Sequence, residues 1–290
     1  MRDLHTHVWP HEPGCERPSV HLLEQYCDRA AQLGIAQIAV TEHSHRFTRI
    51  LGSVVPHWNR ARTGPLADAT DHVLEVEGGA DLDDYVEALL DAQSRGLPVL
   101  VGLEVDYLPG AMDAMATVLA DYPFDILLGS VHWLDAWLFD AYGTPAFAQP
   151  WRTREVGDIY QEYIDAVAEL ARFGLVDVLA HPDVIKVAGH RPANLEDYER
   201  QLAEVIISAD LAVELSSAGL RKLAAEPYPS GELLRQVLSA GVSLTTASDA
   251  HSVDQIGWRF DDLSSALHQL KVTELVTFER RCTVTVPVSS

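Results

Sequence analysis

Short apolar runs alternate with longer amphipathic segments along the chain, and this alternation restricts the fold more than any other feature. Seven runs have the composition of buried strands and cover residues 3–5, 37–40, 99–103, 125–129, 176–180, 211–215 and 242–246. The segments with helical period between them include residues 21–33, 82–94, 156–173, 195–208 and 231–240. Such alternation is typical of βα units around a parallel sheet. The sequence therefore predicts an α/β fold, a single barrel domain over residues 1–290 with seven strands rather than eight.

Two stretches depart from this pattern. Residues 46–80 contain scattered Gly and Pro, several charges and little periodicity. An insertion of that length in a compact domain is typically functional, so we expect an irregular excursion or lid there. Residues 278–288 alternate Thr and Val, which indicates a strand or an extended tail.

The charge balance restricts the partners of the protein. Against 43 Asp and Glu residues there are 21 Lys and Arg residues, a formal net charge of −22. Nucleic acids and anionic membranes are bound through Lys and Arg, so we expect neither as a partner. The apolar runs are too short to span a membrane, and the three widely spaced cysteines suit reduced thiols. The expected location is the cytoplasm, and the sequence specifies no oligomeric state.

Histidines and carboxylates gather where the predicted strands end. His5 and His7 close the first run, where alternation places both on one face of an extended segment. Later runs end near His43, Glu104, His132, His181, Asp249 and His251. Parallel barrel strands end at one rim, where catalytic groups collect. A single histidine at a strand end is usually structural. Here, however, six of the seven runs end in His, Asp or Glu. Because buried imidazoles and carboxylates need partners, this coincidence predicts a multinuclear metal site.

The other histidines give weaker signals. We expect solvated side chains at four positions on helices or irregular segments, which are His21, His57, His72 and His268. His45 and His190 lie close to the predicted rim but outside the motifs, and both interpretations stay open for them.

The strand ends carry six short motifs in order: Asp3-Leu4-His5-Thr6-His7, Thr41-Glu42-His43, Gly102-Leu103-Glu104, Gly129-Ser130-Val131-His132, Ala180-His181-Pro182-Asp183 and Ser248-Asp249-Ala250-His251. This series resembles the motifs of the polymerase and histidinol phosphatase (PHP) superfamily over essentially the whole chain. Residues 129–137, 181–186, 214–222 and 228–230 are similar to its monofunctional histidinol-phosphate phosphatases. The resemblance implies a distorted (β/α)7 barrel with three divalent Zn, Mn or Fe ions and phosphomonoester hydrolysis.

The resemblance also implies a set of metal ligands. One ion would be bound by His5, His7, Glu104 and Asp249, and Glu104 would bridge to a second ion held by His132 and His181. A third ion would take His43, His251 and a ligand from the loop after the first strand. Glu104, Asp249 and His251 would act in catalysis through these ions.

The loop ligand departs from the family pattern. In the family it commonly lies six residues beyond the second histidine of the first motif, whereas His11 lies four residues beyond His7. Glu12 is the alternative. We prefer His11, because an imidazole completes the usual set of three nitrogens.

A cationic anchor for the phosphate is expected beside the ions. Arg221 and Lys222 follow the sixth strand, and Arg191 is a weaker candidate in the loop after the fifth. A guanidinium offers two aligned donors to phosphate oxygens. The rim residues Trp9, Trp133 and Trp137 either shape the pocket or pack structurally, and Asp3 and Asp183 either orient ligand imidazoles or cap strands.

The function that the resemblance implies is hydrolysis of L-histidinol phosphate to L-histidinol and phosphate by a metal-activated hydroxide. One alternative is a PHP-type phosphatase for a different small phosphorylated metabolite. A second is an amidohydrolase-like hydrolase, although that class has a metal-bridging lysine on a middle strand where this chain has Glu104. A third is a metal-binding module without catalytic activity.

Overall fold

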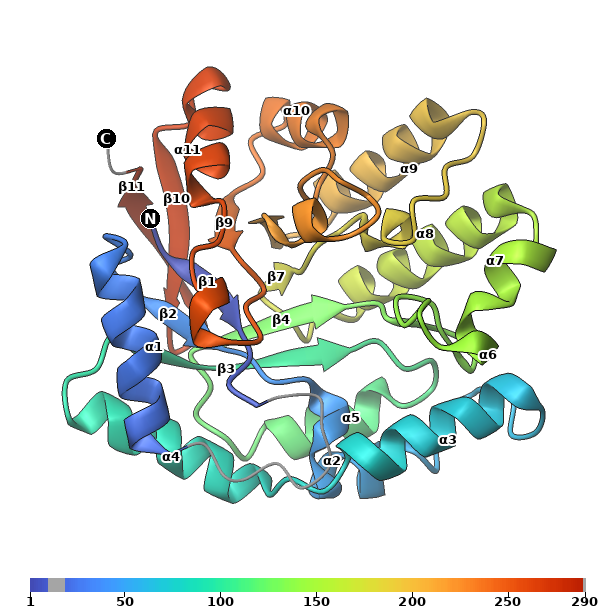
Figure 1. Ribbon diagram of the computed structural model, residues 1–290, viewed down its shortest axis with the longest axis horizontal. Coiled ribbons are helices and arrows are strands. Elements are labelled where there is room, and N and C mark those ends of the chain that lie inside the picture. Colours follow the sequence, from blue (N-terminus) through green and yellow to red (C-terminus); the bar gives the residue numbers. More distant parts are fainter. Residues whose placement is uncertain (10–18, 289–290) are drawn as a thin grey trace.

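A sheet of seven parallel strands forms the centre of the computed structural model, which describes residues 1–9 and 19–288. In sheet order the strands are β1 (Asp3–Thr6), β2 (Ile38–Val40), β3 (Val99–Asp106), β4 (Ile126–Ser130), β7 (Val178–Leu179), β8 (Ala212–Ser216) and β9 (Leu244–Ala247). The first and last strands also meet, because the His7 amide donates to the Ala250 carbonyl at 2.7 Å. The sheet therefore curls into a nearly closed barrel (Figure 1), and the predicted (β/α)7 barrel is confirmed.

Helices surround the barrel (Figure 1). They are α1 (Val20–Gln32), α2 (Thr48–Val54), α3 (Pro65–Glu77), α4 (Leu82–Ser94), α5 (Met112–Leu119), α6 (Pro145–Ala148), α7 (Pro150–Thr153), α8 (Val156–Phe173), α9 (Leu195–Ser208), α10 (Gly231–Ser239) and α11 (Phe260–Gln269). Single 3-10 turns follow four of the strands, at Ser44–Arg46, Val184–Lys186, Ala218–Arg221 and Val253–Gln255. The longest helix, α8, shows why these segments pack on the sheet: Ile159, Tyr163, Val167 and Leu170 recur at helical spacing and are all buried.

The barrel interior is a small apolar core of its own. It contains strand residues Leu4, Ala39, Leu100, Ile126, Leu128, Val178 and Ala212, and Ala180 just after β7, together with Val276 and Phe278. The last two belong to a C-terminal hairpin of antiparallel strands β10 (Glu274–Glu279) and β11 (Cys282–Pro287). Half of the expected strand or tail over residues 278–288 is therefore β11. The hairpin contributes side chains to the barrel core and leaves the opposite rim for polar residues.

The expectation of an irregular segment over residues 46–80 was wrong, because α2 and α3 lie within it. Helix α3 begins at Pro65 after Gly64, which has a φ of 103°, and packs against α6 and the two-residue strand β6 (Trp137–Leu138). Its buried positions are Ala67, Thr70 and Leu74. Only one of these is strongly apolar, so the helical period is weak in the sequence although the helix is packed.

Strand β6 pairs with β5 (Trp133–Leu134) in a short antiparallel hairpin that directly follows β4. Among the residues that the structure describes, no helix is long and apolar enough to cross a membrane.

Candidate metal centre

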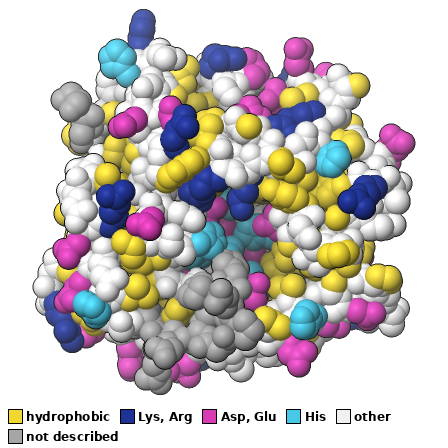
Figure 2. Space-filling view, viewed as in Figure 1, with side chains coloured by type: hydrophobic (Ala, Val, Ile, Leu, Met, Phe, Trp, Pro, Cys, Tyr) yellow, Lys and Arg dark blue, Asp and Glu magenta, His cyan; other side chains and the backbone are white. Residues whose placement is uncertain are grey.

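A cavity of about 500 Å³ opens at the carboxyl ends of the barrel strands, and most of the predicted site residues line it. Figure 2 shows histidine side chains at the bottom of this hollow and Lys and Arg side chains along one edge. The lining includes His43, Glu104, His132, His181, Asp249 and His251, with Arg221 and Lys222. His5 and His7 are fully buried beneath this surface.

Glu104 lies at the centre of the site with a fully buried carboxylate. Its Oε2 atom is 2.6 Å from His43 Nδ1 and 3.4 Å from His5 Nε2. Its Oε1 atom is 3.0 Å from His181 Nε2 and 3.5 Å from His132 Nε2. One carboxylate thus faces imidazoles from the ends of four other strands, which is the position expected of a bridging ligand.

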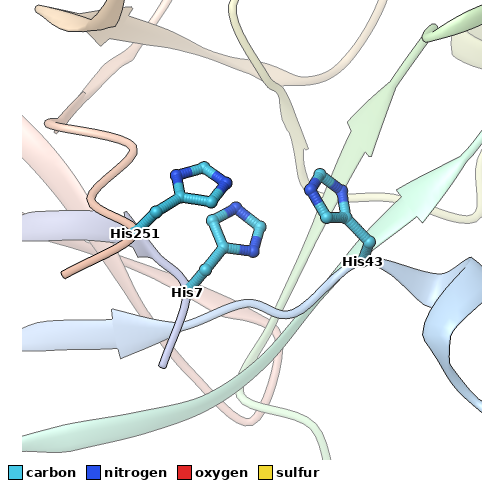
Figure 3. Close-up of side chains that lie close together, drawn as sticks. All are labelled: His7, His43 and His251. Carbon is cyan, nitrogen blue, oxygen red and sulfur yellow. The ribbon is translucent and has the colours of Figure 1, made fainter. Parts of the chain in front are cut away.

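The described residues contain four sets of three potential metal ligands. Within each set, the ligand atoms all lie within 4.8 Å of one another. The sets are His5, His7 and Asp249; His5, Glu104 and His181; His7, His43 and His251; and His43, Asp106 and His132. The third set is drawn in Figure 3, where the rings converge from β1 and from the loops after β2 and β9. The first set agrees with the ion expected between His5, His7 and Asp249. The other three sets mix residues expected at different ions, because His5 also groups with His181, His7 with His43 and His251, and His132 with His43 and Asp106. The predicted loop ligand His11 and its alternative Glu12 lie outside the described residues.

Two of the predicted ligands have unusual backbone conformations. His181 has a φ of 27° and Asp249 a φ of 52°, both in the left-handed region. Non-glycine residues adopt this region rarely, and such strain gathers at functional sites where the surrounding structure enforces it. Each of these residues lies two positions beyond the end of its strand, β7 or β9.

A second layer of carboxylates holds the imidazoles, and the sequence analysis missed it. Glu214 Oε2 lies 2.8 Å from His5 Nδ1, and Asp106 Oδ1 lies 2.8 Å from His132 Nδ1. Both carboxylates leave the Nε2 atom of their histidine directed toward Glu104. Outer carboxylates of this kind fix the orientation of metal-binding imidazoles. One available signal was strand alternation, which puts Asp106 on the same face as Glu104.

Asp3 and Asp183, the two carboxylates that the sequence suggested for this role, hold loops instead. Asp3 accepts hydrogen bonds from the amides of Ser248 and Gly257. Asp183 accepts from the Ser230 amide and pairs with Lys186 Nζ at 2.7 Å. Neither carboxylate is hydrogen-bonded to an imidazole of the described residues, so of the two interpretations left open by the sequence, capping is the closer one.

The charges of the site favour bound cations. Burial alone would raise the pKa of Glu104, but the surrounding histidines His5, His43 and His132 hold this pKa well below its usual range. Burial lowers the pKa of His43 well below its ordinary value, which leaves the neutral imidazole that ligates metals. Burial opposes charge on His132, yet Glu104, Asp106 and Asp140 raise its pKa to about 10. Either a proton on an imidazole or a bound metal cation would balance the negative charge of these carboxylates.

The donor set fits divalent ions. Imidazole nitrogens and carboxylate oxygens without thiolates suit Zn²⁺, Mn²⁺ and Fe²⁺. His5 Nε2 and His7 Nε2 lie only 3.1 Å apart, and both lie within 4 Å of Asp249 Oδ1. Two nitrogens and a carboxylate oxygen that converge in a buried place are arranged as ligands of one ion.

The predicted phosphate anchors separate into two groups. Arg221 lines the cavity, and its Nη2 atom donates to the Asp249 carbonyl at 2.8 Å. Lys222 is exposed beside it. Arg191 instead pairs with Glu226 at 2.8 Å and does not line the cavity, so the structure places it away from the site. Chain proximity to the fifth strand suggested Arg191, but its guanidinium closes a neighbouring loop.

The remaining predictions concern histidines and tryptophans. His21, His57, His72 and His268 are exposed, as expected. His45 lies between Asp106 and Glu77, and His190 stacks on Trp151 with 5.0 Å between ring centroids. Both imidazoles therefore have structural roles, His45 between two carboxylates and His190 against an indole ring. The indoles of Trp9, Trp133 and Trp137 are buried outside the cavity lining, so structural packing is the correct interpretation of these three residues.

The chain is similar to known proteins in sequence and in fold. The family model described as PHP domain matches residues 3–218. A protein of Deinococcus radiodurans named "Probable histidinol-phosphatase" is 29% identical over 279 residues, 96% of this chain and 95% of its own. One of Clostridium acetobutylicum with the same name is 24% identical and covers 69% of this chain and 78% of its own. The structure of histidinol phosphate phosphatase from Lactococcus lactis, complexed with Zn, L-histidinol and phosphate, superposes with a TM-score of 0.70 at 16% identity, covering 97% of this chain and 98% of that one. This likeness shows the shared fold.

Proposed function

Because the chain belongs to the PHP domain family, we propose that it is a metal-dependent phosphomonoesterase that hydrolyses L-histidinol phosphate to L-histidinol and phosphate. The observation that carries this proposal is the convergence of imidazoles and carboxylates on Glu104 at the bottom of a cavity that Arg221 also lines. The names of the relatives from Deinococcus radiodurans and Clostridium acetobutylicum support the substrate. In the reaction, a water oxygen bonds to phosphorus, the ester P–O bond breaks, and the alkoxide oxygen takes up a proton.

Three divalent ions are part of the proposal. His5, His7, Glu104 and Asp249 would hold the first, Glu104, His132 and His181 the second, and His43, His251 and His11 the third. Ions bound in this way make coordinated water acidic and neutralise phosphoryl oxygens. The protein groups keep these ligands in place, and Glu104, Asp249 and His251 take part in catalysis by binding the ions. No nucleophilic Ser or Cys is required.

Arg221 is the proposed anchor of the phosphate. Its guanidinium lies over the Trp258 ring, 5.2 Å from the centroid, and one nitrogen is fixed by the Asp249 carbonyl. The other terminal nitrogen, Nη1, is buried and has no hydrogen-bond partner among the described residues. A phosphate oxygen supplies the acceptor that this donor lacks. Lys222 adds positive charge at the exposed edge.

The backbone that carries Arg221 needs glycine at position 219. A Cβ atom there would lie 2.2 Å from the Glu226 carbonyl oxygen and 2.9 Å from the Tyr228 ring. Gly219 thus allows the loop to pack closely enough for Arg221 and Tyr228 to line the same cavity.

The remaining parts of the proposal are a small anionic phosphomonoester as substrate, the cytoplasm as location and no nucleic-acid partner. The net charge of −22 supports the last of these. Locally, three divalent ions would reverse the sign of the field at the site.

The test is a comparison of substrates with the metal-loaded protein. We expect kcat/KM for L-histidinol phosphate to exceed that for 4-nitrophenyl phosphate, although the aryl ester has the better leaving group. An equal or lower value would contradict the substrate and leave a phosphatase for a different small metabolite. Activity on amides without phosphate release would support the amidohydrolase-like alternative. Bound metal without any hydrolysis would support the binding module.

A further inference from the structure

Apart from atoms of the predicted metal ligands, the cavity lining contains three buried polar atoms for which the described parts of the chain, residues 1–9 and 19–288, provide no hydrogen-bond partner. They are Arg221 Nη1, Tyr228 Oη and Asp140 Oδ1, and all three residues line the cavity. Buried polar groups in folded proteins almost always have partners, so each of these atoms needs an explanation. The phosphate accounts for Arg221, because a guanidinium binds an anion. The hydroxyl and the carboxylate require a ligand group of a different kind.

Asp140 is held at the cavity by the hairpin of β5 and β6. The amide of Phe139 donates to the His132 carbonyl at 3.2 Å, and the Trp151 indole donates to the Phe139 carbonyl at 3.0 Å. Phe139 itself is fully buried. The backbone just before Asp140 is therefore fixed next to His132, a predicted metal ligand, and Asp140 itself lines the cavity.

Tyr228 is equally well fixed. Its backbone exchanges two hydrogen bonds with Ser216 at the end of β8, and its side chain is 1% exposed. A phenol is neutral near pH 7, and the Tyr228 oxygen can accept a hydrogen bond from a cationic N–H donor.

Asp140 is not placed as a metal ligand. It belongs to none of the four ligand sets found within the described residues. A carboxylate would repel the phosphate, so within the substrate its partner would be a group of the organic part. A cationic group satisfies this requirement, because it forms a charge-assisted hydrogen bond with a carboxylate.

We propose that Asp140 and the Tyr228 hydroxyl form a subsite for the primary ammonium group of the substrate, so that the enzyme selects phosphate monoesters of amino alcohols. This inference rests on the proposed function, and it adds the residues that would recognise the organic part of the substrate. Val184 and Val187 line the same cavity and supply an apolar wall for the rest of the molecule. Asp140 and Tyr228 act in specificity, while Arg221 and the ions would hold the phosphate.

The test compares L-histidinol phosphate with its deamino analogue, 3-(imidazol-4-yl)propyl phosphate, which has the same ring and a similar alkyl leaving group. For the metal-loaded wild-type protein we expect kcat/KM to favour the amine by about 10–100-fold, as for one charge-assisted hydrogen bond. Asp140→Asn should abolish this preference by lowering kcat/KM for the amine alone. Tyr228→Phe should reduce the preference by a smaller factor.

Asp135→Asn is the matched control. Asp135 lies in the turn of the same hairpin, is exposed, and accepts a hydrogen bond from the Ala61 amide. We expect both substrates to react at wild-type rates in this variant. Unchanged metal content and melting temperature in Asp140→Asn would show that the variant is folded and loaded.

The outcomes separate the subsite from the proposed function. An equal loss on both substrates in Asp140→Asn would overturn the subsite and indicate a role in proton transfer or folding. Equal wild-type activity on both esters would also overturn it, and phosphatase activity would stand. Hydrolysis of neither alkyl phosphate would contradict the proposed function and the subsite with it.

Discussion

The Nδ1 atom of His132 lies 2.8 Å from Asp106 Oδ1, while its Nε2 atom faces Glu104. The opposite oxygen of Asp106 lies 2.9 Å from His45 Nδ1. One carboxylate therefore fixes two rings, and only one of these rings faces Glu104. This arrangement decides which nitrogen of His132 is available to a metal ion.

Asp106→Ala should weaken metal binding and activity by about 10–100-fold, the usual effect of losing an outer partner of a metal ligand. Asp106→Asn should lose less metal affinity and activity than Asp106→Ala, because an amide oxygen still accepts a hydrogen bond from the imidazole. Metal titration and kcat measure the effect. The control is Asp177→Asn, since Asp177 binds the Leu127 amide and Arg281 without contacting a ligand imidazole. A similar loss of metal in the control would contradict a local cause.

Glu104→Gln should lower kcat and metal content by more than about 10²-fold. This effect is larger than that of Asp106→Ala, because Glu104 is a proposed ligand and Asp106 only orients one. The amide keeps the shape of the side chain but removes the charge that four imidazoles share. Metal analysis and single-turnover phosphate release would show the loss. Glu169→Gln serves as control, because Glu169 is exposed on α8 and bonded to Tyr107. If Glu104→Gln retained full metal content, the bridging role would be wrong.

Removal of the ions should destabilise the fold as well as inactivate the protein. Glu104 and Asp249 would lose cations that stabilise their buried charges. A ligand at 100 times its dissociation constant stabilises the folded state by about 2.7 kcal/mol. We expect treatment with a chelator to lower the melting temperature by several degrees, and added Zn²⁺ or Mn²⁺ to restore both stability and activity. Calorimetry with and without chelator measures this shift, and an unchanged melting temperature would contradict the expectation.

Arg221→Ala and Arg191→Ala should behave differently. Loss of a charge-assisted contact to the phosphate should reduce kcat/KM about 10–100-fold in Arg221→Ala, chiefly through KM if the contact already forms in the ground state. Arg191 pairs with Glu226 away from the cavity, so its loss should cost about 1 kcal/mol of stability or less and leave kcat/KM unchanged. Steady-state kinetics and thermal unfolding of both variants test this contrast. Equal effects of the two substitutions on kcat/KM would contradict the proposal that Arg221, and not Arg191, binds the phosphate.

The two described cysteines should differ in reactivity. Burial, with the charges of Asp28 and Glu24, raises the pKa of the Cys27 thiol to about 11. Only about 10⁻³ of this thiol is ionised at pH 8, and the fraction rises tenfold at pH 9. Cys282 is exposed. Peptide mapping after iodoacetamide treatment should find Cys282 modified first, with Cys27 alkylation accelerating as pH rises, and equal rates at pH 8 would refute the difference.

Much of the fold could be predicted from local pattern. Helices α4, α8 and α9 begin and end at the residues where the apolar period begins and ends, because each buries one continuous stripe. Helix α3 escaped prediction because its buried face is made mostly of small and polar residues. The hairpin of β5 and β6 escaped because two-residue strands carry no period.

The candidate site divides in the same way. Strand-end position was enough to predict that His5, His7, Glu104 and Asp249 lie together, because parallel strands end at one rim. It was not enough for Arg191, Asp3 or Asp183, which are near the motifs in the chain but directed elsewhere.

By itself the sequence determined the barrel, the rim and the residue types that gather there, because periodicity and strand ends are local properties. Only the tertiary structure decided which carboxylate meets which imidazole, as in Glu214 with His5 across 209 positions of the chain. It also decided that Asp140, Tyr228 and Arg221 share one cavity. Such contacts depend on loop paths and side-chain directions, which burial and packing select after the strands have formed the barrel.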